Sequence, residues 1–159
     1  MAWGQETEVL IGTLSAAAVP PAEPRHLLCH LWLAEHRQGQ LEGAKDRRCA
    51  IVLTTESADG ETVVTVAPIT HSPSRDEAAA VEIPVATKQR LGLDAERSWV
   101  IVSEVNRFVW VGPDLRPVSR DAPDRFDYGM LPPALFTRIK TRLIECAQRR
   151  RTALIIREE

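Results

Sequence analysis

The chain has 159 residues, of which 44% are hydrophobic and 26% are charged, and its net charge is −2. These proportions are close to the average for globular proteins, and they exclude a disordered chain, a collagen-like chain and a histone-like polycation. The apolar runs fall well short of the roughly 20 residues that cross a bilayer. The sequence therefore predicts a soluble protein with no membrane association.

The cysteines indicate a reducing compartment. Cys29, Cys49 and Cys146 are spread over the chain in an odd number, and no CxxC pair occurs. This pattern indicates neither a disulfide framework nor a zinc ribbon, so we expect reduced thiols in the cytoplasm. The apolar segment 9–19 is similar to the core of a signal peptide, but no Lys or Arg precedes it, as a secretory signal requires.

Residues 1–24 are expected to form an N-terminal extension that ends in a linker. Its last residues, VPPAEP, place proline at three of the final five positions. Proline removes backbone donors and favours extended polyproline geometry. Residues 25–159 are then expected to form a single domain.

From residue 27 onward the pattern predicts mostly strands, because short runs of β-branched and apolar residues alternate with turn signals. Asp59-Gly60 is a strong turn signal and predicts a hairpin. Gly92 closes a short helix that is predicted over Thr87–Leu91. The strands are predicted over Leu27–Ala34, Cys49–Thr54, Thr62–Thr70, Val81–Pro84, Trp99–Val105 and Phe108–Val111.

The periodicity changes after Pro132-Pro133, where Leu135, Ile139 and Leu143 follow at intervals of four residues. This spacing predicts an amphipathic helix with prolines in its first turn. A last short strand is expected over Ala153–Ile156. Strands followed by one long helix indicate the α+β class, with the strands curled into a small antiparallel barrel.

Polar residues that could carry chemistry stand next to the predicted strands. Lys45-Asp46-Arg47-Arg48 directly precedes a strand, where a charged cluster is either a solvated loop or part of a site. Thr70 and His71 stand at the end of another strand, and they can share a site only if the strand ends between them. Glu104 and Arg107 lie three residues apart, in a predicted tight turn.

Other site chemistries find little support. His26, Cys29 and His30 suggest a metal, but in a strand Cys29 points away from the two histidines, and no spaced Cys/His pair supplies further ligands. No GxSxG, Walker or GxGxxG pattern occurs. We therefore expect no metal site, no serine hydrolase and no nucleotide cofactor.

Taken in order, the motifs KDRRCAIVL, VAPIT, VEIP, LGLD, SEVNR and YGMLP resemble the MazF/PemK (Kid-like) family of toxin endoribonucleases. The resemblance covers about residues 28–147. It implies an SH3-like barrel, a homodimer, an antitoxin protein as partner, and cleavage of single-stranded RNA without a metal or other cofactor.

Carried over by position, Arg47 matches the loop arginine of the family, Thr70 its strand-end threonine and Glu104 its acidic residue. Arg48 stands where the family usually has proline, and the loop 35–44 lacks the histidine that some members have. His71 is the residue that we expect to replace this histidine, because an imidazole is suited to proton transfer near neutral pH.

These residues suit cleavage of RNA by its own 2′-hydroxyl, which needs a base, an acid and cationic donors for the phosphorane. Arg47 would stabilise the phosphorane charge and Thr70 would position the phosphate. Glu104 would act as the base or hold Arg47 in place. Lys45, Arg48 and Arg107 are the expected additional RNA contacts, and Trp32, Phe108 or Trp110 could stack on bases unless they belong to the core.

Two alternatives stay open at this point. One is a non-catalytic RNA- or protein-binding module on the same barrel, which the departures at Arg48 and in the loop 35–44 favour. The other is a structural or regulatory partner protein that uses the basic helix for protein contacts. The negative net charge weakens an RNA role, although a local basic patch, and not the total charge, attracts phosphates.

Overall fold

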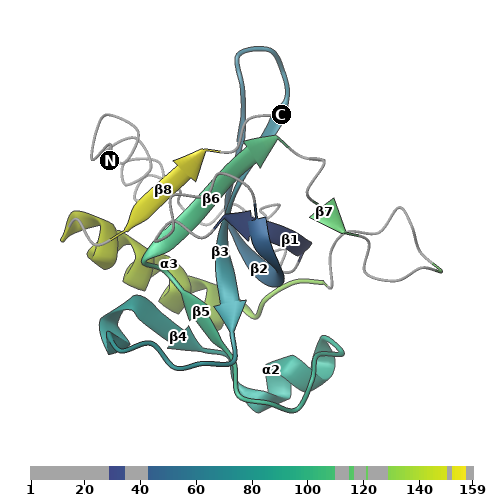
Figure 1. The fold of residues 1–159 in the computed structure, drawn as a ribbon, viewed down its shortest axis with the longest axis vertical. Helices are drawn as coiled ribbons and strands as arrows, with labels where there is room; N and C mark the ends of the chain where they lie inside the picture. The colour runs from purple at the N-terminus through teal and green to yellow at the C-terminus, as the bar shows by residue number, and fades with distance from the viewer. Residues whose placement is uncertain are drawn as a thin grey trace.

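Eight strands form one curled sheet, and a C-terminal helix packs against it (Figure 1). The computed structural model describes residues 29–34, 43–109, 115–116, 121, 129–149 and 152–156, and the expected extension 1–24 and His26 lie outside this part. The strands are β1 (Cys29–Ala34), β2 (Gly43–Glu56), β3 (Thr62–Thr70), β4 (Ala80–Glu82), β5 (Trp99–Ile101), β6 (Glu104–Val109), β7 (Leu115–Arg116) and β8 (Ala153–Ile156). The helices are the 3₁₀ turn η2 (Glu77–Ala79), α2 (Val85–Arg90) and α3 (Pro133–Gln148).

The sheet is mixed. β7, β1, β2 and β3 are neighbours, β5 and β6 both pair with β3, and β4 and β8 pair with β5 and β6 respectively. The ladders of the described strands are antiparallel except the one between β6 and β8, which is parallel because α3 returns the chain before β8 begins. The α+β class and the curled sheet are thus confirmed, with β8 adding a parallel edge.

The predicted hairpin joins β2 to β3, and its turn lies at the top of Figure 1. Gly60 has a φ of +80°, which is the left-handed conformation that glycine adopts at little cost. The Ser57 carbonyl accepts a hydrogen bond from Gly60 N at 3.0 Å, and the Ser57 hydroxyl accepts one from Glu61 N at 3.1 Å. The Asp-Gly signal therefore marks the turn correctly.

β2 begins earlier than the sequence predicted. The cluster from Lys45 to Arg48 lies inside the strand, paired with β1 from Leu33↔Lys45 to His30↔Arg48, and not in a loop before it. The ladder with β1 supplies hydrogen-bond partners for this charged backbone, so the segment is extended despite its composition.

The segment Glu104–Arg107 was also predicted wrongly, as a turn. β5 ends at Ile101 and β6 begins at Glu104, so these residues lie inside a strand. Both strands run along β3: from Val100 to Asn106 the chain advances six residues while β3 advances three, from Ile69 to Val66. The surplus residues bend the strand, as a bulge does, and this bend helps the sheet to curl.

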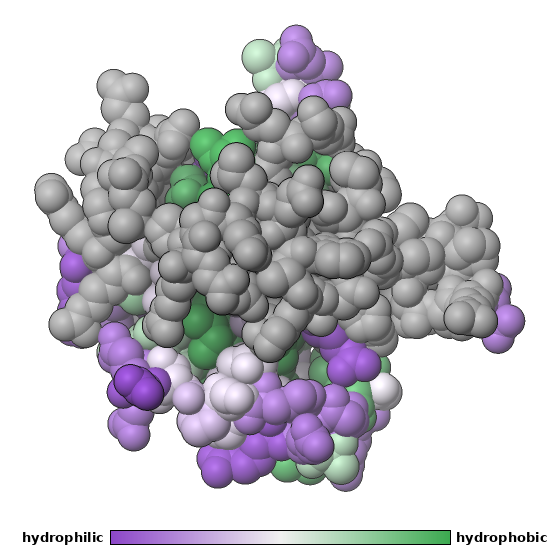
Figure 2. All heavy atoms as spheres, in the orientation of Figure 1, coloured by the Kyte–Doolittle hydropathy of each residue, from purple (hydrophilic) through white to green (hydrophobic). Residues whose placement is uncertain are grey.

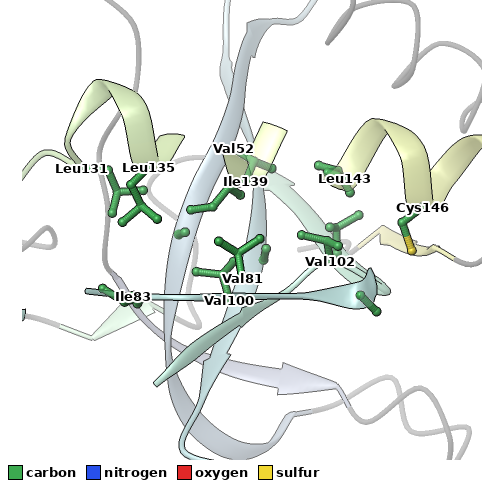
Figure 3. Packing of buried hydrophobic residues seen from close by; sticks show 14 residues of the cluster. Val52, Val81, Ile83, Val100, Val102, Leu131, Leu135, Ile139, Leu143 and Cys146 are labelled. Carbon is green, nitrogen blue, oxygen red and sulfur yellow. The ribbon is translucent and has the colours of Figure 1, made fainter. Parts of the chain in front are cut away.

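α3 confirms the amphipathic pattern after the prolines. Leu135, Ile139 and Leu143 are buried and face Val81, Val100 and Val102 of the sheet region, as Figure 3 shows. These valines mark one face of the sheet as the α3 side, and the residues that alternate with them project to the opposite face. Within the described residues, no helix is both long and apolar enough to cross a membrane.

Candidate functional site

The end of β3 brings neighbouring strands together on the face of the sheet opposite α3. Thr70 is the last residue of β3 and pairs with Trp99 of β5, which in turn pairs with Glu82 of β4. Directly opposite residues project to the same face of a sheet with their Cβ atoms about 5 Å apart. Thr70, Trp99 and Glu82 therefore form a row across the sheet.

Arg47 belongs to the same row by register. The β2–β3 ladder ends at Cys49↔Pro68, and each step back along β2 corresponds to one step forward along β3. Two further steps place Arg47 at the strand position opposite Thr70. The pairs that the structure has at these two residues are Arg47 with Leu31 of β1 and Thr70 with Trp99 of β5, so Arg47 stands opposite Thr70 only by continuing the β2–β3 register past its last pair. The side chains of Arg47 and Lys45 lie outside the described part.

His71 follows directly after the strand, so the alternation of strand residues no longer decides where its ring points. Nδ1 lies 3.1 Å from the Arg97 carbonyl oxygen, 3.2 Å from the Ser98 hydroxyl and 3.5 Å from a Glu96 carboxylate oxygen. Nε2 lies 3.3 Å from Asp94 Oδ2. The ring is held on both sides, and its side chain is still 47% exposed.

The groups around the His71 ring are hydrogen-bond acceptors, apart from the Ser98 hydroxyl, which can also donate. The Arg97 carbonyl and the Asp94 carboxylate can only accept hydrogen bonds, so Nδ1 and Nε2 satisfy both only as donors. The Ser98 hydroxyl can donate to Nδ1 after that nitrogen has lost its proton. The surroundings of the ring therefore offer hydrogen-bond acceptors and, at the Ser98 hydroxyl, a donor.

Asp94 lies at the centre of this cluster, in the loop that follows α2. Its Oδ2 accepts a hydrogen bond from Arg48 at 3.2 Å and faces His71, and its Oδ1 accepts one from Lys88 at 2.8 Å. Hydrogen bonding to Lys88 lowers the pKa of Asp94 below its ordinary value, with a smaller lowering from the Glu96 backbone N–H, while burial acts in the opposite direction. Asp94 therefore links groups from β2, α2 and the residue after β3.

Lys88 is the buried cation that fixes the loop. Its side chain is only 4% exposed, and Nζ donates to Asp94, to the Ser98 hydroxyl at 2.7 Å and to the Glu96 carbonyl. A buried ammonium requires such partners. The turn of the chain that brings the loop back begins at Gly92, which has a φ of +70°, and Leu93 N donates to the Lys88 carbonyl at 2.9 Å.

Glu82, Arg97 and Trp99 make a second, contiguous group at the sheet surface. Arg97 donates through Nε to one Glu82 oxygen at 2.7 Å and through a terminal nitrogen to the other at 2.9 Å. These bonds lower the pKa of Glu82 and raise that of Arg97. The guanidinium carbon of Arg97 also lies 5.0 Å from the Trp99 ring centroid. In the orientation of Figure 1, hydrophilic side chains cover the lower part of the molecule, where β4, β5 and α2 lie (Figure 2).

The other residues that the sequence singled out lie further along the strands. Continuing the β3–β6 register places Glu104 opposite Pro68, about 7 Å along β3 from Thr70. Arg107 pairs with Thr65, which is about 17 Å along β3 from Thr70. Phe108 is buried, so it belongs to the core and not to a stacking surface.

His71, Asp94 and Glu96 could together hold a metal ion, since one ligand atom from each lies within 4.8 Å of the others. Such an ion would meet a competing cation, because Lys88 already donates to Asp94. The donors of His71 also diverge, with Nε2 toward Asp94 and Nδ1 toward Glu96. An imidazole ring with a carboxylate near each nitrogen can serve proton transfer as well as metal binding.

Comparison with known proteins identifies the family of this chain. Residues 29–108, which are half of the chain, match the family described as the PemK-like, MazF-like toxin of type II toxin-antitoxin systems. Neither curated proteins nor solved structures give a significant match. The chain belongs to this toxin family, and membership implies an antitoxin as its partner.

Asp94, Lys88 and Ser98 are site residues that sequence reasoning missed. Asp94 stands in the LGLD motif, which carried part of the family resemblance but suggested no role for the aspartate. Lys88 lies in the predicted short helix, and a lysine there gives no sign of burial in the sequence. Their importance depends on the loop 91–98 turning back toward β3, which local pattern does not reveal.

The lowered pKa of Asp94 predicts a specific loss of stability in acid. Because its pKa in the folded protein lies below the unfolded value near 4, the carboxylate stabilises the fold above that value, and this contribution is lost as the pH falls through the folded pKa. The free energy of unfolding, measured with urea from pH 6 to pH 3, should fall more steeply for the wild type than for Asp94→Asn. Asp59→Asn at the exposed hairpin tip should keep the wild-type slope; equal slopes for all three proteins would contradict the prediction.

Proposed function

We propose that this toxin is a metal-independent endoribonuclease that cuts single-stranded RNA through the ribose 2′-hydroxyl. The observation that carries the proposal is the end of β3, where the strand stops at Thr70 and His71 comes to lie against Asp94 and Ser98. Thr70 ends the strand and His71 follows it directly, so a hydroxyl and an imidazole stand next to each other in the chain at the end of β3. Family membership supports the toxin role, and this geometry supports the reaction.

In the proposed reaction the 2′-hydroxyl attacks the adjacent phosphorus, the bond to the 5′ oxygen breaks, and a 2′,3′-cyclic phosphate forms. Arg47 stabilises the charge of the phosphorane and Thr70 positions the phosphate through its hydroxyl. His71 in its charged form donates a proton to the leaving oxygen. Glu104, on the same face of the sheet by register, accepts the proton of the 2′-hydroxyl.

Arg48 and Lys88 have a supporting role in this proposal. Both donate to Asp94, which faces His71, so they hold the carboxylate in place and offset its charge near the RNA. Lys45 and Arg107 contact the RNA backbone outside the reacting phosphate. The toxin acts as a homodimer in the cytoplasm, and its antitoxin inhibits it. Sedimentation of the purified protein at micromolar concentration measures whether it is a dimer.

The products of RNA cleavage test the proposal directly. Purified protein should cut short single-stranded RNA equally well with and without EDTA, and it should leave a 2′,3′-cyclic phosphate or 3′-phosphate and a 5′-hydroxyl. RNA with 2′-deoxyribose at the scissile position should bind but resist cleavage. Loss of cleavage in EDTA would contradict metal independence and favour an ion at His71, Asp94 and Glu96. Salt-dependent binding without any cleavage would favour the non-catalytic binding module.

A further inference from the structure

The row that contains Thr70 continues onto β5 and β4 with two side chains that the reaction does not use. Trp99 stands between Thr70 on β3 and Glu82 on β4, and Arg97 lies over its ring. We call this group the Arg97 platform: the planar groups of Arg97 and Trp99, with Glu82 beside them. It is the nearest cross-strand neighbour of the threonine that the proposed function places on the scissile phosphate.

Arg97 is unusually fixed for a side chain that is 68% exposed. Glu82 accepts from two of its nitrogens at 2.7 and 2.9 Å, and the Trp99 ring lies 5.0 Å away on one side. An exposed arginine normally loses rotamer freedom when a ligand binds to it. Here Glu82 and Trp99 already hold the guanidinium plane, so the entropic cost of binding is reduced before any ligand arrives.

The contacts of Arg97 suit a base better than a phosphate. Glu82 occupies one of the two edges through which a guanidinium makes bidentate bonds to phosphate oxygens, and its charge offsets that of Arg97, which weakens attraction to a phosphate. The face of the guanidinium plane that points away from Trp99 carries no bond to Glu82, because those bonds lie in the plane. Unpaired RNA bases stack on arginine planes as well as on aromatic rings.

We propose that the Arg97 platform is a base-binding subsite, on which one unpaired nucleobase next to the scissile phosphate stacks. The proposal rests on the proposed function, since it assigns a subsite to the same RNA. The Arg97 platform takes the place of Phe108 as the group on which an RNA base stacks, because Phe108 is buried. Single-stranded RNA can offer an unpaired base to this subsite. A base inside a duplex cannot reach it, because that base is already stacked and paired.

Abasic substitution measures stacking at one position of the RNA. Short single-stranded RNA with 2′-O-methyl ribose throughout binds without being cut, and the tightest-binding sequence of a panel serves as the probe. Its bases are removed one at a time. For the wild type, removal at one position should weaken binding about tenfold, in keeping with the usual contribution of a stacked base. For Arg97→Lys, which keeps the charge and loses the plane, this position-specific penalty should fall below about threefold.

Two further variants separate the platform from general effects. Glu82→Gln keeps Arg97 but loosens it, so the penalty at the same position should shrink. Arg138→Lys makes the same change on the exposed face of α3 and should keep the full penalty. Circular dichroism and urea unfolding check that all the variants remain folded.

The outcomes distinguish this proposal from the one on which it rests. Equal penalties in the wild type and Arg97→Lys would overturn the base subsite and leave the endoribonuclease proposal standing. Weaker binding of every probe by Arg97→Lys, with the penalty unchanged, would show a phosphate contact and also overturn it. If the wild type binds no probe and cuts no RNA, the proposed function fails, and the subsite fails with it.

Discussion

Replacing Arg47 by alanine is expected to slow RNA cleavage by about 100-fold or more, with the fold unchanged. The charge that develops on the phosphorane is greatest in the transition state, so a cation at this point lowers the barrier more than it strengthens binding. Continuing the β2–β3 register by two residues past Cys49↔Pro68 assigns Arg47 the strand position opposite Thr70, and the proposed reaction therefore puts it beside the phosphate. The loss should therefore appear mainly in kcat, measured with a fluorogenic RNA at saturating concentration.

Arg48→Ala is the matched control for Arg47→Ala, since the two residues are adjacent and both are cations. The guanidinium of Arg48 donates to Asp94, which also accepts from Lys88 and faces His71, so Asp94 keeps most of its partners in this variant. A partly exposed ion pair of this kind contributes about 1 kcal/mol or less, and we expect cleavage to fall less than about tenfold. Equal losses in both variants would contradict a specific role for Arg47 and indicate a general basic patch.

The parts of the fold that are encoded locally could be predicted from the sequence. The Asp-Gly turn of the β2–β3 hairpin and the glycine after α2 both require left-handed backbone, and both are found. The spacing of Leu135, Ile139 and Leu143 fixes the buried face of α3 in the same way. These signals depend on neighbouring residues, so tertiary contacts do not change them.

The elements that depend on distant partners could not be predicted as well. The charged start of β2 is extended because β1 pairs with it, and the bend between β5 and β6 arises because both strands follow β3. The alternation of polar and apolar residues within one segment predicts neither the pairing of β1 with β2 nor the bend between β5 and β6. β8 pairs with β6 in the parallel orientation because α3 returns the chain before β8 begins, and it lies on the edge of β6 that does not pair with β3.

The candidate site shows the same division. Thr70 and Arg47 could be proposed as site residues from the sequence because each stands at a fixed place in a motif. The cluster around His71 could not, since Asp94 and Lys88 reach it only through the folded loop after α2. The sequence proposed Arg107 as an RNA contact, and the strand register shows its distance from Thr70, about 17 Å along β3.

Replacing His71 by glutamine is expected to slow cleavage of ordinary RNA by about 100-fold or more, because proton donation by a positioned side chain usually contributes at least that much. Glutamine retains hydrogen-bonding capacity but cannot release a proton near neutral pH. The ring is fixed in position by Asp94 and the Arg97 carbonyl and is still 47% exposed, so RNA can reach it. Single-turnover cleavage rates measure the loss without interference from product release.

A substrate with a 5′-bridging sulfur distinguishes proton donation from a structural role of His71. A thiolate is a far better leaving group than an alkoxide and needs no proton, so His71→Gln should cut this RNA nearly as fast as the wild type does. Arg47→Ala should stay slow on it, because phosphorane charge still develops whichever atom leaves. A structural role for His71 predicts the opposite result, since a distorted site would cut both substrates slowly. If His71→Gln is equally impaired on oxygen and sulfur leaving groups, the assignment of His71 as the acid is wrong.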